Sequence, residues 1–291
     1  MKKINIFCFG FGQVAKNFIT KIKLEKYNIN LTSTSRKGTS KKNFNGINYT
    51  NYLFNSDKYD KDLIPKLREA DHILVSIPPK DNGDIVIKNF SKLLEDSKVK
   101  WITYLSATSV YGDHKGEWVD ESSETKPTSL KGLARLKAEN SWLSLKMHKN
   151  IPVQIFRLSG VYSNESNILM RLKLGTVELI QKSDHYFSRI HVEDIANILF
   201  KSLSKFKSGE IYNLADDKPS SSEEITIHGA KLLNINNLKK INVNEIESKT
   251  LKSFYKDSKK VNNKKIKKYF SYNLKFPTYE EGLGYIRDNF I

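Results

Sequence analysis

Residues 4–18 read INIFCFGFGQVAKNF, and this stretch decides the fold. Its apolar run, Ile4–Phe9, predicts a buried strand, and the residues from Gln13 onward predict a helix. Gly10 permits a tight turn between these two elements, and Gly12 leaves the backbone open to the approach of a bulky group. Strand, glycine turn and helix in this order are typical of the G-x-G-x-x-A fingerprint.

The fingerprint predicts a dinucleotide site. The N-terminus of a helix offers free N–H groups and a partial positive charge, and both suit a pyrophosphate. We therefore expect Gly10, Gly12, Gln13 and Val14 to contact the cofactor, with Ala15 packed closely on the strand. The alternative interpretation is a glycine turn without a ligand.

Length and composition narrow the class of protein. The chain has 291 residues, enough for one large domain or two smaller ones. No apolar run reaches the length of a bilayer, and the run behind Met1–Lys3 is too short for a signal peptide. The single cysteine, Cys8, allows no internal disulfide. We therefore expect a cytoplasmic protein with no membrane partner.

The net charge of +17 raises nucleic acid as a partner. Much of this charge lies in residues 239–268, which hold eleven lysines and no arginine. Arginine is the usual reader of base edges, and the sequence shows no nucleic-acid-binding motif. We interpret these lysines as a solvated surface, and nucleic-acid binding through them is the distant third hypothesis of function.

The second predicted strand indicates the type of cofactor. Residues 30–35 predict a strand that ends at Arg36, and no acid occurs between residues 28 and 55. An acid here would bind the ribose 2′-OH of NAD, whereas an arginine accommodates the 2′-phosphate of NADP. Ser35 can donate a hydrogen bond, and Arg36 can pair with a phosphate. We therefore expect NADP, with NAD as the alternative; in the other interpretation, Arg36 belongs to a basic surface loop.

Further strands and helices alternate along the chain. Strands are predicted at 47–52, 71–77, 101–106 and 151–156, and helices at 62–69, 84–95 and 127–147. This alternation predicts an α/β fold with a doubly wound, mostly parallel sheet of the Rossmann type. Because the carboxyl ends of such strands meet at the cofactor, we expect Ile77, Pro78 and Ser106 to lie beside it.

Four later segments carry motifs that occur together in one family. They read LSATSVYG (105–112), FRLSGVY (156–162), SRIHVEDIA (188–196) and GEIYNLA (209–215). In this order they resemble the extended short-chain dehydrogenase/reductases, the family of nucleotide-sugar epimerases and dehydratases. Residues 258–266 and 276–283 resemble the tail of an atypical branch. The resemblance implies a Rossmann domain at 1–165, to which 189–215 return, a smaller substrate-side domain at 166–291, and Leu158 beside the cofactor.

The resemblance also shows that the family's proton relay is replaced. It places Ala107 at the relay serine or threonine, Lys131 at the tyrosine and Arg135 at the lysine. Arg135 can hold the cofactor ribose and supply a fixed charge. Lys131 can be a base only with a lowered pKa, and the alternative is a solvated helix lysine. Thr108 fills a position where the family's dehydratases carry an acid. Tyr111 flanks the expected nicotinamide position, as a proton donor or a packing residue.

Two hypotheses of function stay open. One is an NADP-binding epimerase, dehydratase or reductase that acts on a sugar-like or other small polyol substrate with a non-standard acid/base. The other is a catalytically silent NADP-binding sensor or partner-binding protein. The loop after Tyr162 lacks the family's Gly-Pro-Gly-Arg, which argues against a nucleotide diphosphate. The resemblance implies a homodimer through the helix at 127–147, and the sequence shows no cluster of metal ligands.

Overall fold

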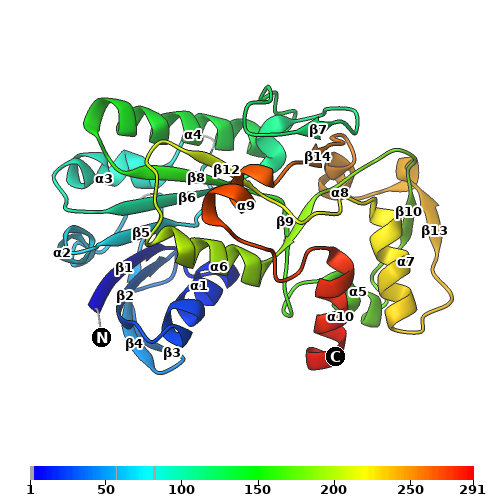
Figure 1. Cartoon of the computed structure of the whole chain (residues 1–291), viewed down its shortest axis with the longest axis horizontal. Coiled ribbons are helices and arrows are strands. Elements are labelled where there is room, and N and C mark those ends of the chain that lie inside the picture. The colour runs from blue at the N-terminus through cyan, green and yellow to red at the C-terminus, as the bar shows by residue number, and fades with distance from the viewer. Residues whose placement is uncertain (1–2, 57, 81–82) are drawn as a thin grey trace. The chain divides into compact units, whose positions relative to one another are not determined.

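The computed structural model describes residues 3–56, 58–80 and 83–291; Met1 and Lys2, at the start of the segment considered above as a leader, lie outside them. The largest sheet of the described residues has eight strands in the order β12-β8-β6-β5-β1-β2-β4-β3 (Figure 1). Their bounds are β1 Lys3–Phe9, β2 Asn28–Ser35, β3 Ser40–Phe44, β4 Ile47–Leu53, β5 His72–Val75, β6 Trp101–Ala107, β8 Val153–Leu158 and β12 Ile211–Leu214.

The direction of the strands confirms the predicted fold class. The pairs β1–β2, β1–β5, β2–β4 and β5–β6 are parallel, and only the edge pair β3–β4, among the pairings described for this sheet, is antiparallel. The helices between them are α1 Gln13–Leu24, α2 Leu63–Arg68, α3 Ile85–Glu95, α4 Leu130–Lys149 and α6 Val192–Ser202. The chain is therefore an α/β protein with a doubly wound sheet of the Rossmann type.

The chain divides into two compact units. Unit 1 comprises Met1–Ala107, Leu133–Arg157 and Ile195–Ile211, and unit 2 comprises Thr108–Gly132, Leu158–Asp194 and Tyr212–Ile291.

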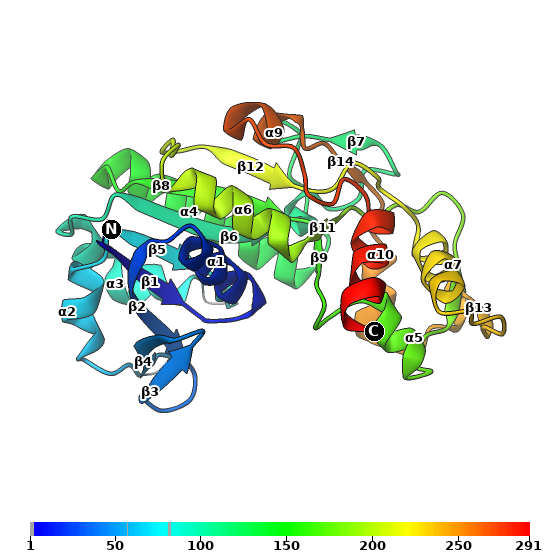
Figure 2. The same cartoon turned by 60° about the horizontal axis from the view of Figure 1, so that its bottom comes forward.

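Helices cover both faces of the sheet in unit 1. On one face, an aromatic core joins the strands to α3 and α4, and Trp142 of α4 stacks on Tyr104 of β6. On the other face, Trp101 of β6 stacks on Phe18 of α1, with 6.0 Å between ring centroids, and its Nε1 donates a hydrogen bond to Ser202 Oγ of α6. Because successive side chains of a strand point to opposite faces of the sheet, β6 contributes residues to the cores on both faces. Figure 2 shows α1 beside α6.

The strand β3 is not among the predicted elements. Residues 40–44 form it, and it pairs with β4, which confirms the strand predicted at 47–52. The two strands are joined by Asn45 and Gly46, whose φ angles are +51° and +79°. Two positive φ angles in a two-residue loop are the geometry of a tight hairpin, and Asn-Gly is the sequence that favours it.

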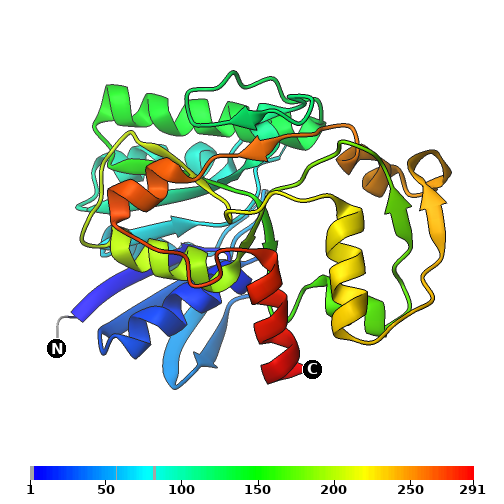
Figure 3. The same ribbon diagram turned by 45° about the vertical axis from the view of Figure 1, so that its right-hand side comes forward.

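Unit 2 is built from short elements (Figure 3). Three parallel two-stranded ribbons, β9–β11, β10–β13 and β7–β14, join segments that are distant in sequence. Helices α5, α7 and α10 meet in a core around Leu169, Ile225 and Leu283. The bounds are η1 Thr108–Tyr111, β7 Trp118–Val119, β9 Gly160–Tyr162, α5 Ile168–Lys173, β10 Leu179–Gln181, β11 Arg189–His191, α7 Ser222–Leu232, β13 Lys240–Asn242, η2 Val243–Glu245, α8 Lys249–Phe254, β14 Lys260–Val261, α9 Lys264–Phe270 and α10 Tyr279–Phe290.

Among the residues that the structure describes, no helix combines the length and the apolar character needed to cross a bilayer.

Candidate functional site

The glycine turn between β1 and α1 is held from two neighbouring strands. Gly10 has a φ angle of +86°, and a Cβ atom at this residue would lie 2.8 Å from Ile77 Cγ2 and 2.9 Å from Ser76 Oγ. Gly10 N donates a hydrogen bond to Thr34 Oγ1 at 3.2 Å, and Ser76 Oγ donates one to Phe9 O at 3.0 Å. The ends of β2 and β5 therefore fix the turn, and a side chain at position 10 would be strained.

Gly12, in contrast, faces open space. It is the N-cap of α1, it makes no side-chain capping bond, and the first turn of α1 carries no acid. A Cβ atom at Gly12 would meet no protein atom within 4 Å. Helix α1, which begins at Gln13, therefore has no side-chain cap at its N-terminus. The space where a side chain of residue 12 would lie holds no protein atom. Such a helix end can bind an anionic group through main-chain N–H groups.

Two polar residues stand at the carboxyl end of β2. Ser35 Oγ accepts a hydrogen bond from Asn51 Nδ2 at 2.7 Å. Arg36 follows it on the exposed surface and has no ion-pair partner within the described part of the chain. Because β1 and β2 are parallel neighbours, Arg36 lies at the same edge of the sheet as the glycine turn. A guanidinium at this place can pair with a phosphate.

The strands β5 and β6 end at this edge as well. Ile77 and Pro78 follow β5, and Ser106 is the second-last residue of β6. The Ser106 hydroxyl is buried and has no hydrogen-bond partner among residues 3–56, 58–80 and 83–291. Buried hydroxyls are normally paired, so Ser106 marks this edge as a place for a further polar group. Leu158, the last residue of β8, belongs to unit 2, and its contact with a cofactor stays a prediction.

A buried ion pair connects α4 with β8. Arg157 Nη2 donates to Glu139 Oε2 at 2.7 Å, and Arg157 Nε donates to Glu139 Oε1 at 3.1 Å. One turn before Glu139, Arg135 Nη1 donates to the Leu105 carbonyl of β6 at 3.0 Å. One further turn back, Lys131 is exposed to solvent. Arg135 therefore uses part of its guanidinium to bind β6. The Lys131 side chain is exposed, so its ammonium remains solvated.

In unit 2, Tyr111 belongs to a hydrogen-bonded chain. It ends the short helix η1 that Thr108 begins, and it is fully buried. Tyr111 Oη donates to Asn213 Oδ1 at 2.8 Å, and Asn213 N donates to Glu121 Oε1 at 2.7 Å. Burial raises the pKa of Glu121. These contacts give Tyr111 a packing role, and catalysis by Thr108 or Tyr111 stays a prediction.

The sequence interpretation passed over Asp216, which follows the carboxyl end of β12. Its carboxyl is buried, and Oδ2 has no hydrogen-bond partner among the described residues. Burial raises the pKa of Asp216 to about 8, although the charge of Arg189 opposes the shift. The signal available in the sequence was the acid pair Asp216-Asp217 directly after the GEIYNLA motif at 209–215. Thr34 and Ser76, which hold the glycine turn, were missed as well; each stands near the end of a strand.

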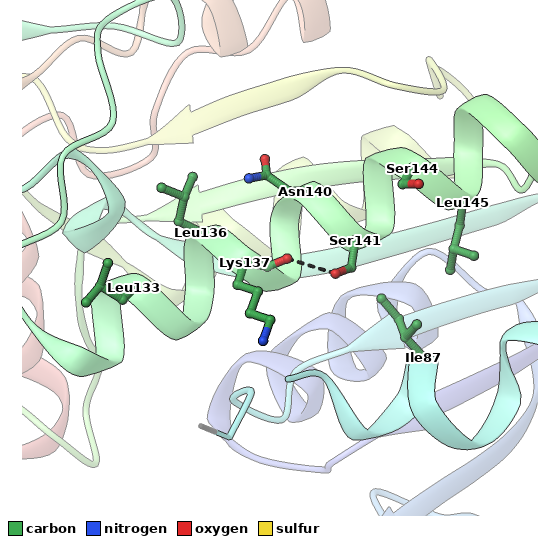
Figure 4. A pocket seen from close by; sticks show the side chains of 8 residues that line it. All are labelled: Ile87, Leu133, Leu136, Lys137, Asn140, Ser141, Ser144 and Leu145. Atoms are coloured by element: carbon green, nitrogen blue, oxygen red, sulfur yellow. Dashed lines mark hydrogen bonds between the residues drawn. The ribbon is translucent and has the colours of Figure 1, made fainter. Parts of the chain in front are cut away.

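A groove of about 610 Å³ runs along α4 beside α3 (Figure 4). Its lining is mixed: Ile87, Leu133, Leu136, Lys137, Asn140, Ser141, Ser144 and Leu145. Within it, Ser141 Oγ donates to the Lys137 carbonyl at 2.9 Å. No residue of the glycine turn lines this groove, which is therefore separate from that turn.

Comparison with known proteins gives three findings. Residues 86–215 match the sequence model of the NAD dependent epimerase/dehydratase family. The chain is similar to a conserved protein of unknown function from Silicibacter pomeroyi, with 28% identity over 99% of both chains and a TM-score of 0.86. It shares its fold with UDP-N-acetylglucosamine 4-epimerase from Bacillus cereus (16% identity, 99% and 98% of the chains, TM-score 0.77) and with dTDP-glucose 4,6-dehydratase from Bacillus anthracis in complex with NAD (18%, 99% and 96%, 0.75). No curated protein sequence matches the chain.

Proposed function

We propose that this chain, whose residues 86–215 match the sequence model of the NAD dependent epimerase/dehydratase family, binds NADP at the glycine turn and acts on a sugar-like or other small polyol substrate. The open space at Gly12, beside the uncapped start of α1, carries this proposal, because it fits a diphosphate held by main-chain N–H groups. The nicotinamide group, when bound, supplies or accepts a hydride. That chemistry is common to epimerases, dehydratases and oxidoreductases.

The chain's own residues would bind and orient the cofactor. The N–H groups at Gln13 and Val14 would hold the diphosphate, and Ser35 and Arg36 would hold the adenosine ribose and its 2′-phosphate. Ser106 offers a hydroxyl at the same edge. Arg135 keeps a fixed positive charge near the end of β6, where it bonds the Leu105 carbonyl.

The replacement Gly12→Ala is expected to remove cofactor binding without unfolding the protein. A methyl group here meets no protein atom, so the cost in stability should stay below about 1 kcal/mol. The same methyl group occupies the space of the diphosphate, so NADPH affinity should fall at least about tenfold. Titration calorimetry and thermal unfolding measure the two effects on one sample.

Gly10→Ala is the matched control for this experiment. Its Cβ atom would clash with Ile77 and Ser76, and its φ angle is positive, so this variant should lose stability itself. If Gly12→Ala bound NADPH as tightly as the original chain, the diphosphate would not lie at the start of α1, and the proposal would fail.

The choice of NADP depends on Arg36. Arg36→Ala should weaken NADPH binding about tenfold or more and leave NADH binding nearly unchanged, since only NADPH carries the 2′-phosphate. Arg36→Lys, which keeps the charge without the forked geometry, should lie between the two. Calorimetry with both coenzymes gives the comparison. Equal losses for NADPH and NADH would argue for NAD.

A second function is supported by the replaced relay. Ala107 has no hydroxyl, Lys131 is exposed, and Arg135 is bonded to the Leu105 carbonyl. This observation favours a catalytically silent NADP-binding sensor or partner-binding protein. A panel of nucleotide sugars and free polyols, incubated with the protein and either redox form of NADP, separates the two functions. Product formation would establish an enzyme, whereas tight coenzyme binding without turnover would favour the sensor.

We further propose that the chain forms a homodimer through the groove on α3 and α4. Leu133 at its edge is 50% exposed, and the lining mixes leucines with serines, asparagine and lysine. Leu133→Glu should therefore convert the dimer to a monomer in light scattering at micromolar concentration, because it places a charge in the interface. Leu174→Glu changes a leucine that is 73% exposed and does not line the groove, so it should leave the mass unchanged. A monomeric original chain would remove this proposal.

We also propose a cytoplasmic location. Its support is Cys8, the one cysteine of the chain, which is buried as a free thiol in β1. Fractionation of cells that express the full chain tests this location.

A further inference from the structure

The β3–β4 hairpin is docked on the glycine turn and on α1. The ring of Phe11, which stands between Gly10 and Gly12, lies 5.3 Å from the ring of Phe44 and 5.2 Å from that of Tyr49, measured between centroids. At the tip of the hairpin, Asn45 Nδ2 donates to Thr20 Oγ1 of α1 at 3.0 Å. The hairpin is thus fixed at two places, at Phe11 in the glycine turn and at Thr20 in α1.

The register of the hairpin determines which side chains face α1. Lys42 pairs with Tyr49, and Lys41 pairs with Thr50. Directly paired residues of an antiparallel ladder point to the same face, and neighbours along a strand point to opposite faces. Since Tyr49 contacts Phe11, Lys42 shares the face that meets the glycine turn. Lys41 belongs to the opposite face.

The same face of the hairpin is connected to Ser35 by a hydrogen bond. Ser40 pairs with Asn51, whose Nδ2 donates to Ser35 Oγ at 2.7 Å. Lys42 therefore lies on β3 between Ser40 and Phe44. Ser40 is linked through its pairing partner Asn51 to the end of β2, and Phe44 contacts the glycine turn. This is the stretch between the proposed ribose site and the proposed diphosphate site.

The charges around this stretch are mainly positive. Arg36, Lys41 and Lys42 are exposed, and none of the three has an ion-pair partner in the part of the chain that the structure describes. One acid, Asp60, is connected to the segment, through a hydrogen bond that Thr39 Oγ1 donates to Asp60 Oδ2 at 2.7 Å. Residues 36–44 contain no acid themselves.

From this arrangement we infer that Lys42 is a specificity-determining residue, whose ammonium binds the 2′-phosphate of NADP together with Arg36. The inference rests on the proposed function, because it needs the dinucleotide at the glycine turn. The hairpin thereby becomes part of the cofactor site. Its docking on Phe11 and Thr20 holds the lysine in place, which lowers the entropy lost when the phosphate binds.

The test compares two neighbouring lysines on opposite faces of one strand. Lys42→Ala and Lys41→Ala are titrated with NADPH and NADH, and with adenosine 2′,5′-bisphosphate and 5′-AMP as fragments with and without the phosphate. Lys42→Ala should weaken NADPH and the bisphosphate about tenfold and leave NADH and AMP within about twofold. Lys41→Ala should stay within about twofold for all four ligands. Lys42→Arg should restore most of the loss, and the loss should shrink at high salt.

Two results would overturn the inference. An equal effect of Lys42→Ala on NADPH and NADH would place Lys42 at a group that both coenzymes share. Equal, small effects of both lysine variants would mean that only the general charge of the surface matters. Failure of the proposed function is a different result, because the original chain itself would then bind neither NADPH nor NADH.

Discussion

Replacing Arg157 with leucine is expected to lower the free energy of unfolding by about 3–5 kcal/mol. Arg157 and Glu139 are 4% and 1% exposed, and hydrogen bonds from Arg157 Nε and Nη2 reach both carboxylate oxygens of Glu139. Without the guanidinium, the Glu139 carboxylate stays buried with no compensating charge, which destabilises the folded state. Urea unfolding followed by circular dichroism measures the loss.

Two controls test whether the loss of stability comes from leaving a buried charge unpaired or simply from breaking an ion pair. Lys149→Ala breaks an ion pair of similar length, 2.8 Å, with Glu95, but both side chains are largely exposed, so the expected loss is at most about 1 kcal/mol. The double replacement Arg157→Leu with Glu139→Leu should recover much of the stability, because no charge stays buried. A loss as small as that of Lys149→Ala would contradict this account.

The sequence predicted the parts of unit 1 whose signals are local. The glycine turn and helix α1, which runs from Gln13 to Leu24, follow from two glycines and an apolar pattern. Strands such as β5 and β6 were found because a buried parallel strand is a continuous apolar run. These patterns depend on neighbours within about ten residues, so they can be read without knowledge of the fold.

The β3–β4 hairpin was not predicted, although the sequence contains a signal for it. Residues 40–44 contain two lysines and one apolar residue, Phe44, so their composition gives no strand signal. The pair Asn45-Gly46 was the evidence, since it favours a two-residue hairpin loop in front of the predicted strand at 47–52. With the hairpin in place, the register that separates Lys41 from Lys42 follows directly.

Other features of the site depend on contacts between residues that are distant in the sequence. The sequence could place Arg135 on a helix, but its bond to the Leu105 carbonyl joins residues thirty apart. The hydrogen bond from Tyr111 to Asn213 spans a still longer separation, 102 residues. The sequence fixes neither pairing, because each depends on how the elements pack in three dimensions. The catalytic assignments of Lys131, Thr108 and Tyr111 therefore stay predictions.

Gly282→Ala is expected to destabilise unit 2, although alanine is the better helix former. Gly282 lies within α10, and a Cβ atom there would clash with Tyr162 Oη and come within 2.7 Å of two carbons of that ring. The ring also packs on His191 at 5.1 Å between centroids, so it has little freedom to move away. Overpacking of this kind costs about 1–3 kcal/mol.

The same helix supplies the matched control. Gly284 lies two residues further along α10, and a Cβ atom at that position would meet nothing within 4 Å. Gly284→Ala should therefore stabilise the protein by about 0.5–1 kcal/mol through helix propensity alone. Thermal unfolding of the two variants should give shifts of opposite sign.

A double replacement identifies the atom responsible. The Tyr162 hydroxyl has no hydrogen-bond partner among the described residues, so Tyr162→Phe should cost little or even stabilise the protein. Because the hydroxyl is the nearest atom to the added methyl group, Tyr162→Phe should recover part of the loss caused by Gly282→Ala. Simple addition of the two single effects would show that the methyl group clashes with something other than this hydroxyl. A stabilising Gly282→Ala would mean that α10 is not in contact with Tyr162 at all.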